Sequence, residues 1–571
     1  MRSRSTAAVA AAAVLLGAID TYVVVLALPA MMSDVGIGLD RLQQGAPIIS
    51  GFLLGYVVLM PLLGRLSDVY GRTRLLVICL LVFAAGSLVT AAAHSLGSLV
   101  AGRVLQGAGG GGLVPVTLAL VADRWPARQR AVPLGIVAAV QELGSVLGPV
   151  YGGLILAVST WRTIFWINLP VACLLAALLV ARRPHRRGRS RAGAAAAVLG
   201  GVAVLAGGLA VASPPALADD ATVGALFAPI AAEWLTPLTI VAAVTALGFA
   251  ALLITRGNAA PALAPSASVD WAGGLLLAGA LAAVVIAFAT GDPSREVVST
   301  VAWWALPAGA VAAALFVVRE RRAAQPMVDV RQLRSAAAFG PLLVNVAVGA
   351  ALMAALVDVP IFARVSAARD SQLGAALVLL RLLAAVPVGA VAGGLLVRRF
   401  GAQLVAGAGL AVTTAALVLM SRWGADALVT PLGAGWLHPA DLTLVAAGLG
   451  FGLAIAPVNA SILNAVRPDW HGVASALVVV ARVTGMLVGI SVLTAVGLHV
   501  FYTNAAQLPS AQALCPHNPL RCPAYERLTT AAVVAELRAI FVGAAACAGV
   551  AAALALALLS RGTRHAAPRN V

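Results

Sequence analysis

Long apolar runs, separated by short polar connections, make up most of the chain. About twenty apolar residues are enough for a helix to cross the hydrocarbon core of a bilayer. The sequence therefore predicts an all-α polytopic membrane protein with about 14–16 spans. The runs lie near residues 6–32, 44–63, 75–94, 97–121, 131–157, 163–181, 192–212, 237–255, 270–290, 300–318, 336–361, 371–397, 402–421, 440–464, 473–500 and 531–559.

The runs divide into two six-span halves and a linker region. Residues 1–181 and 336–571 carry six runs each, and residues 182–335 carry four. After its second span the first half reads GRLSDVYGR, and after its second span the second half reads GLLVRRFG, with the same glycine spacing. Repeat-built transporters bind their substrate between the halves. The repeat therefore predicts a substrate site at the centre of the molecule.

The distribution of charged residues indicates which connections lie on the cytoplasmic side of the membrane. Only 10% of the residues are charged, the formal net charge is +17, and the chain contains no lysine. The arginines gather in the even-numbered connections, as the positive-inside rule requires of cytoplasmic loops. We therefore expect a multi-pass protein of the cytoplasmic membrane, with both termini cytoplasmic and no nucleic-acid partner. The first run resembles a signal peptide, but its length and Asp20 favour a retained helix.

The cysteines fall into two groups. Cys515 and Cys522 lie in the polar segment CPHNPLRC, within a connection at 501–530 that parity places on the outer side. A disulfide is expected there if that side is oxidising. The alternative, a metal site, would add His517. The remaining three occupy apolar runs as small core residues: Cys79, Cys173 and Cys547.

Two acids lie about halfway along predicted spans, Asp20 in the first and Glu142 in the fifth. An ionisable group at mid-bilayer costs roughly 3 kcal/mol or more, so it indicates a functional site. Burial favours the neutral carboxyl and a nearby arginine favours the charged one, so a conformational change can load and release a proton. The alternative is a fixed acid that satisfies a neighbouring arginine. Arg482 is the expected cationic partner.

Three further polar positions have more than one interpretation. Arg381 stands within a span, either in an ion pair, for which Asp358 is a candidate, or lining a cavity. Asn168 is interpreted as helix-start packing. The glycines at 109–112 indicate close helix contact and not a phosphate-binding loop, because the chain has no P-loop lysine.

Several motifs resemble those of the major facilitator superfamily. The loop after the second span carries Gly64, Asp68, Gly71 and Arg72, and Arg103 with Gln106 and Gly107 resembles the fourth-span motif. The fifth span resembles the signature of drug–proton antiporters. The chain is most similar to the fourteen-span group with linker helices that includes mycobacterial lipid and multidrug exporters working with a periplasmic lipoprotein. The fifth-span signature residues are Gly135, Gly144, Gly148, Pro149, Gly152 and Gly153.

The resemblance implies roles for individual residues. Asp68 would dock against the start of the eleventh superfamily-type span, near His471, and latch one conformation. Arg72 would share that role or would only mark the cytoplasmic side. Arg103 would relay protons or hold an acid.

The expected function is proton-coupled export of hydrophobic or amphiphilic compounds, lipids or drugs, by alternating access. The proton motive force would drive it without a cofactor or a metal, in a monomer whose partner is a periplasmic lipoprotein. Few polar groups occur in the spans, which favours a greasy cavity. A polar outer connection and a predicted hairpin at 422–439 favour lipids over drugs. A nutrient importer and a non-transporting scaffold or sensor are the alternatives, and nothing indicates an enzyme.

Overall fold

A computed structural model describes residues 2–38, 42–125, 131–181, 270–289, 296, 298–323, 335–366, 371–429, 438–466, 471–515 and 522–559. Within these ranges the regular structure is helical, and 13 helices are long and apolar enough to cross a membrane. A further apolar helix, α10, is shorter. The prediction of an all-α polytopic fold is confirmed. The runs at 192–212 and 237–255 and the basic tail lie outside the described residues.

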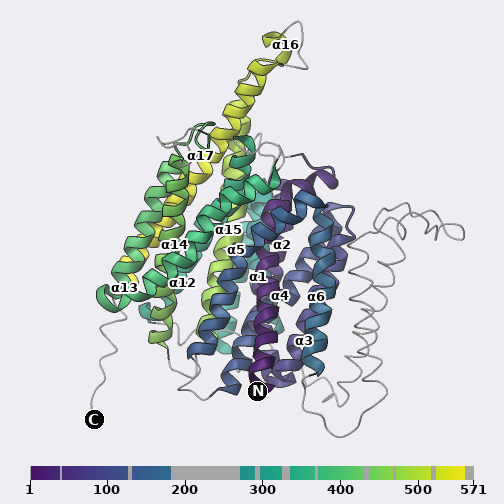
Figure 1. Cartoon of the computed structure of the whole chain (residues 1–571), viewed down its shortest axis with the longest axis vertical. Coiled ribbons are helices and arrows are strands. Elements are labelled where there is room, and N and C mark those ends of the chain that lie inside the picture. The colour runs from purple at the N-terminus through teal and green to yellow at the C-terminus, as the bar shows by residue number, and fades with distance from the viewer. Residues whose placement is uncertain are drawn as a thin grey trace, which may run out of the picture.

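The helices of the two halves lie side by side in one bundle (Figure 1), and equivalent pairs of helices are in contact within each half. In the first half α1 packs on α5, and α3 on α6; in the second, α12 packs on α15, and α13 on α17. The first half contains α1 (Arg2–Asp34), α2 (Leu42–Tyr70), α3 (Arg72–Ala91), α4 (Leu96–Arg124), α5 (Ala131–Val158) and α6 (Trp161–Ala181). The second contains α12 (Ala336–Val365), α13 (Gln372–Met420), α14 (Pro439–Ala465), α15 (His471–Ala505), α16 (Ala511–Leu514) and α17 (Pro523–Leu554), which ends in a π-helical turn, Ala555–Leu559.

The repeated glycines have the same backbone conformation in both halves. Gly71, between α2 and α3, has φ 85°, and Gly401 has φ 80°. Left-handed backbone of this kind favours glycine, because a Cβ would strain it. Gly401 breaks α13 into two spans, so α13 corresponds to α2 and α3 together. The internal repeat predicted from the glycine spacing is therefore present in the backbone.

Glycines of the fifth span let α5 approach α1 closely. A Cβ on Gly148 would lie 2.8 Å from the Ile19 carbonyl oxygen, and one on Gly152 would lie 2.8 Å from Val23 Cγ2. Small residues at such contacts allow packing that larger side chains would prevent. Gly144 also faces α1, and the helix continues through the buried Pro149 and Gly153. These residues set the position of the part of α1 that carries Asp20.

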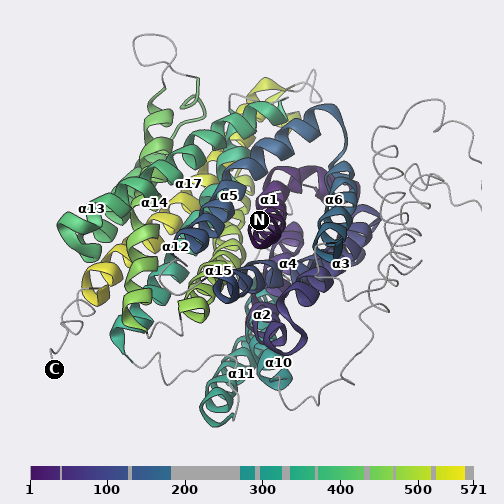
Figure 2. The same ribbon diagram turned by 60° about the horizontal axis from the view of Figure 1, so that its bottom comes forward.

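The linker contributes a helical hairpin, α10 (Trp271–Ala289) and α11 (Ala302–Arg322). Figure 2 shows the hairpin at one side of the bundle, where α10 contacts both α2 and α15. Arg319 Nε donates to Asp270 Oδ1 at 2.6 Å and joins the two ends of the hairpin. Trp303 of α11 is 87% exposed, as a lipid-facing side chain can be. The two helices correspond to the apolar runs expected near 270–290 and 300–318.

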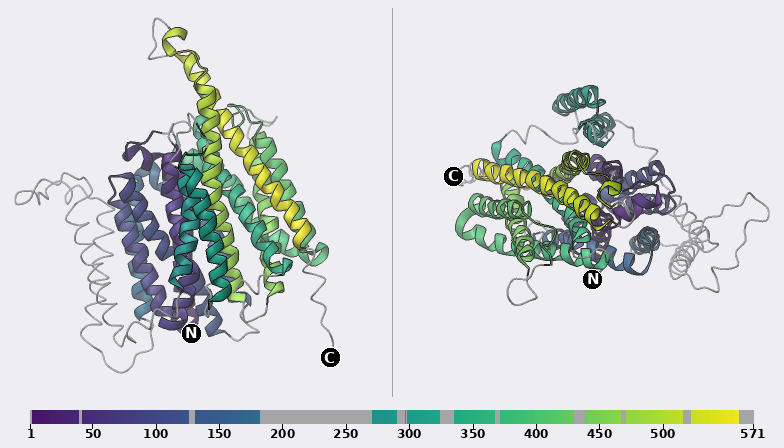
Figure 3. Two further views of the ribbon diagram at one scale, coloured as in Figure 1. Left: turned by 180° about the vertical axis from the view of Figure 1, so that it is seen from behind. Right: turned by 90° about the horizontal axis from the view of Figure 1, so that it is seen from above.

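The polar connection between α15 and α17, expected at 501–530, is shorter in the structure than the sequence predicts. Residues 501–505 complete α15 and 523–530 begin α17, so the expected loop at 501–530 is largely helical. Both helices extend beyond the rest of the bundle, with α16 at the tip (Figure 3). In the predicted hairpin region, residues 422–429 form no strand, and 430–437 lie outside the described residues. The outer projection is therefore helical.

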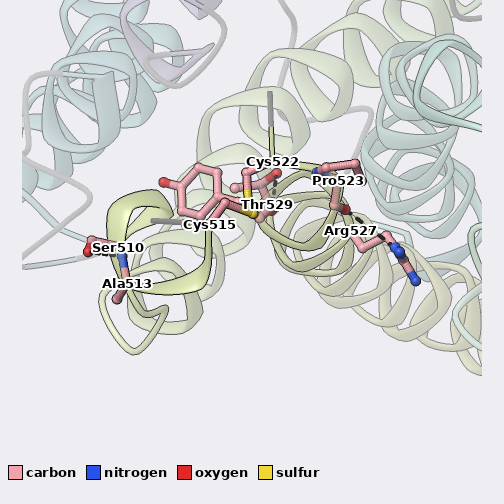
Figure 4. Close-up of a disulfide and its surroundings, with 8 residues drawn as sticks. Ser510, Ala513, Cys515, Cys522, Pro523, Arg527 and Thr529 are labelled. Atoms are coloured by element: carbon pink, nitrogen blue, oxygen red, sulfur yellow. Dashed lines mark hydrogen bonds between the residues drawn. A yellow bond between two sulfur atoms is a disulfide. The ribbon is translucent and has the colours of Figure 1, made fainter. Parts of the chain in front are cut away.

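A disulfide closes this projection. Cys515 and Cys522 are joined, with sulfur atoms 2.07 Å apart (Figure 4). Ser510 Oγ accepts from the Ala513 N–H at 3.2 Å and caps α16. The link ties the end of α16 to the residue before α17.

The close contact between α1 and α5 predicts a stability effect. Gly148→Ala should lower the apparent melting temperature of the purified protein, because overpacking costs about 1–3 kcal/mol. Gly97→Ala is the control, because a Cβ at Gly97 meets nothing within 4 Å. Equal melting temperatures for the two variants would contradict this packing account.

Candidate functional site

A buried polar cluster surrounds Asp20 in the first half. Asp20 lies near the middle of the apolar segment Thr6–Asp34 and is 1% exposed. Arg103 Nη1 donates to Asp20 Oδ2 at 2.8 Å. Gln106 Nε2 and Asn168 Nδ2 donate to Asp20 Oδ1 at 2.9 and 2.6 Å. The carboxylate thus accepts three hydrogen bonds, from α4 and α6.

Arg103 is fully buried and is held from several sides. Its Nε donates to the Ile48 carbonyl at 3.3 Å, and its guanidinium lies 4.3 Å from the centre of the Phe52 ring. Nη2 has no hydrogen-bond partner among the described residues. A cation over an aromatic face is stabilised by the ring quadrupole, more strongly when desolvated. The arginine therefore depends on Asp20 and Phe52 for charge compensation.

Glycines of α4 bring the surrounding helices close enough to form this cluster. A Cβ on Gly107 would collide with the Phe52 carbonyl of α2, and one on Gly109 would collide with the backbone of Phe83 on α3. The interpretation of the 109–112 glycines as close helix contacts is confirmed. Gln106 Nε2 also donates to Ser87 Oγ at 2.8 Å, which ties α4 to α3.

Asp20 pairs with Arg103 and not with Arg482, and a pairing of Arg482 with Glu142 stays a prediction. Arg103 is the partner of Asp20 because α4 lies beside α1 in the same half, whereas Arg482 stands on α15 in the other half. Arg482 is buried and lines a cavity between the halves, together with Tyr22, Tyr56 and Gln141. Glu142, the residue after Gln141, lies in α5, but its side chain is outside the described residues, as is that of the motif's first position, Gly135.

The cavity between the halves has mainly apolar walls and is small in this conformation, with a volume of about 20 Å³. It is bounded by α1, α2, α4 and α5 of the first half and by α15 of the second. Thr21 and Tyr22 line it directly after Asp20 in the sequence, so α1 joins the cavity to the buried cluster. The apolar wall is formed by Val14, Ala18, Leu53, Leu113, Val114, Val483 and Met486.

Two other polar side chains have partners that the sequence did not indicate. Asn168 lies in the interior of α6 and binds Asp20, so helix-start packing is wrong for it. The signal in the sequence was an amide inside an apolar run. Arg381 pairs with Asp441 and not with Asp358. Asp441 also accepts from the His438 N–H at 3.1 Å, in a capping box at the start of α14.

The predicted latch loop makes contacts within the first half. Arg72 Nε donates to Asp123 Oδ2 at 3.0 Å, and this exposed pair joins the start of α3 to the end of α4. Gly64 packs near Pro115 of α4. The side chains of Asp68 and His471 lie outside the described residues. Docking of Asp68 on α15 therefore stays a prediction.

Two similarly packed six-helix halves, with an ion pair buried in one and a cavity between them, are the architecture of a membrane transporter. The family model described as Major Facilitator Superfamily matches residues 10–318. The chain belongs to this superfamily, and this makes it a membrane transporter rather than an enzyme.

Close sequence relatives are mycobacterial. A triacylglyceride transporter of Mycobacteroides abscessus is 37% identical over 512 residues, which cover 88% of this chain and 84% of the relative. One of Mycolicibacterium smegmatis is 37% identical over 528 residues, covering 91% and 80%. One of Mycobacterium tuberculosis is 37% identical over 507 residues, covering 87% and 83%.

Solved structures share the fold. A bacterial homologue of the human lysosomal transporter Spinster, in an inward-facing and occupied conformation, aligns with TM-score 0.58 and 15% identity over 98% of each chain. A proton-dependent oligopeptide transporter aligns with TM-score 0.52 and 13% identity, over 98% of this chain and 99% of the other. The predicted superfamily fold is confirmed.

The Asp20–Arg103 pair predicts strong non-additivity. Asp20→Asn should destabilise the protein by about 3–5 kcal/mol, because it leaves Arg103 as an uncompensated buried charge. The double variant D20N/R103Q should lose less than the sum of the two single changes, measured as melting temperature in one detergent.

Asp123→Asn is the matched control, because it removes an exposed ion pair worth at most about 1 kcal/mol. Additive losses at positions 20 and 103 would show that the two side chains do not depend on each other.

Proposed function

We propose that this protein is a proton-coupled exporter of apolar lipids of the triacylglyceride class. The observation that carries the proposal is the buried Asp20–Arg103 pair beside the apolar cavity between the halves. The names of the mycobacterial relatives support the lipid class. The antiporter-type glycines of α5 support outward transport.

Protonation of Asp20 would change its cluster in a defined way. A neutral carboxyl no longer compensates Arg103, and both side chains are fully buried. The low dielectric of the interior makes an uncompensated charge costly. Arg103 would then need a new partner or more water, and α1 would shift. Because Thr21 and Tyr22 line the cavity, the shift would alter the substrate site.

A second proton-responsive contact is proposed between the halves. Arg482 enters the cavity from α15, and Glu142 follows the cavity-lining Gln141 on α5. An ion pair between Arg482 and Glu142 would hold the halves together at the cavity. Proton binding to Glu142 would release it, in keeping with alternating access driven by the proton motive force.

The shape of the molecule favours lipid cargo over drugs. A drug exporter needs only the cavity, whereas an apolar lipid must also cross the aqueous space outside the membrane. The projecting ends of α15 and α17, tied by the Cys515–Cys522 disulfide, offer a surface on which lipid would pass to a periplasmic lipoprotein. Multidrug export is the second candidate, which the apolar cavity alone would serve. A nutrient importer is disfavoured by the α5 signature, and a scaffold has no use for buried charge.

Neutralising the coupling acids should abolish lipid export in cells. A deletion strain complemented with Glu142→Gln or Asp20→Asn should show the lipid profile of the uncomplemented strain, because neither residue can then exchange a proton. Untargeted lipidomics and immunoblots of membranes provide the measurement and the expression check.

Asp426→Asn is the control, since this exposed acid in the connection between α13 and α14 should complement fully. Unchanged lipids with altered drug tolerance in the acid variants would overturn the lipid proposal and favour drug export.

Removing the projection should affect the delivery of lipid to a partner protein without affecting lipid binding. Replacing residues 503–526 by a short glycine–serine linker should abolish lipid delivery to a periplasmic lipoprotein, because the surface beyond the bundle is lost. Lipid binding by the purified protein should remain near that of the wild type. Lipid delivery at the wild-type rate would show that the projection has no part in transfer.

A further inference from the structure

A second pair of buried acids lies in the other half of the molecule. Asp358 on α12 is 2% exposed and Glu536 on α17 is 7% exposed. The two helices pack together, and α15 places the two acids at one level. Gly485 and Gly489 of α15 meet Val346 and Ala350 of α12, and the same spacing brings Gly497, which lies against Glu536, opposite Asp358. Asp358 Oδ1 has no hydrogen-bond partner among the described residues. Neither acid contributes to the Asp20 cluster or lines the cavity described above.

No cation compensates these two acids in the described part of the chain. Arg538, on α17 itself, donates to the Trp423 carbonyl at 2.8 Å. Arg381 of α13 is paired with Asp441 of α14. No hydrogen bond or ion pair in the described ranges reaches Asp358 or Glu536. The other charged or titratable groups with described side chains on these helices and the elements packed against them are Asp20, Tyr22, Asp34, Arg364, Arg399, Arg482, His499, Tyr502, Tyr525, Glu526, Arg527 and Cys547.

Two uncompensated carboxylates in one buried contact repel each other. In a low dielectric this repulsion and the loss of hydration oppose the state in which both are ionised. The backbone of α15 closes the space beside them, because a Cβ on Gly497 would lie 3.3 Å from Glu536 Cγ. Glu536 is therefore confined between α12 and α15. The least costly state of the contact holds a proton.

We propose that Asp358 and Glu536 form a second proton-binding site, in which a shared proton holds α17 against α12. Loss of that proton leaves two like charges between the helices and pushes them apart. The outer part of α17 belongs to the projection closed by the disulfide, so the site links proton binding to the position of that projection. It is separate from Asp20 and does not depend on the proposed transport cycle.

Infrared difference spectroscopy of the full-length protein in nanodiscs tests the proposal. At neutral pH the wild type should show a protonated-carboxyl C=O band that the double variant D358N/E536Q lacks, with a loss equal to one carboxyl group per protein. Asp20→Asn and the exposed Glu526→Gln should each keep this band. A double variant with the full wild-type band would overturn the proposal.

The melting temperature provides a second readout that requires only single variants. Because the folded state holds a proton that the unfolded chain releases, wild-type stability should fall as the pH rises from about 5 to about 8. Asp358→Asn should reduce this slope and Glu526→Gln should leave it unchanged. Equal slopes in all three proteins would contradict the shared proton. A slope that vanishes when sodium is replaced by choline would show a metal-cation site instead.

Discussion

The buried ion pair between Asp20 and Arg103 is the interaction on which the first half of the molecule depends. Both side chains are completely buried, and neither charge has another ionic partner in the described residues. A buried polar network in which some groups lack hydrogen-bond partners is less stable than an apolar core. The amides of Gln106 and Asn168, the Phe52 ring and the Ile48 carbonyl therefore have to be in place together. Any motion that moves α1 relative to α4 must change this set of contacts.

The close helix packing follows from that requirement. Glycines of α4 bring α2 and α3 to the arginine, and glycines of α5 hold α1 at the position that presents Asp20. The same α1 places Thr21 and Tyr22 at the cavity between the halves. A change in the charge of one buried carboxyl can thereby reach the cavity between the halves through a single helix. Among the described residues of the second half, no such ion pair joins α12 to α14, the counterparts of α1 and α4, and the buried acids lie at the contact of α12 with α17.

Much of the fold was predictable from the sequence, because span length and glycine spacing are local properties. The helices, the repeat at Gly71 and Gly401, and the pairing of Cys515 with Cys522 all follow from such patterns. The partner of Asp20 was not predictable in that way. Depth along a span favours Arg482 over Arg103, which lies nearer the outer end of its span in the sequence, but depth does not say which face a residue occupies. Only the fourth-span resemblance indicated that Arg103 could hold an acid. Asn168 was missed because it lies near a helix start in the sequence, yet it reaches the cluster through the packing of α6 on α1.

The central claim is that transport moves a proton through Asp20. The most direct measurement is proton flux in proteoliposomes that hold an imposed pH gradient and a pH-sensitive dye, with triacylglyceride added as substrate. The wild type should dissipate the gradient only when substrate is present, and Asp20→Asn protein inserted to the same level should not. Equal, substrate-dependent proton flux in the two proteins would contradict the account.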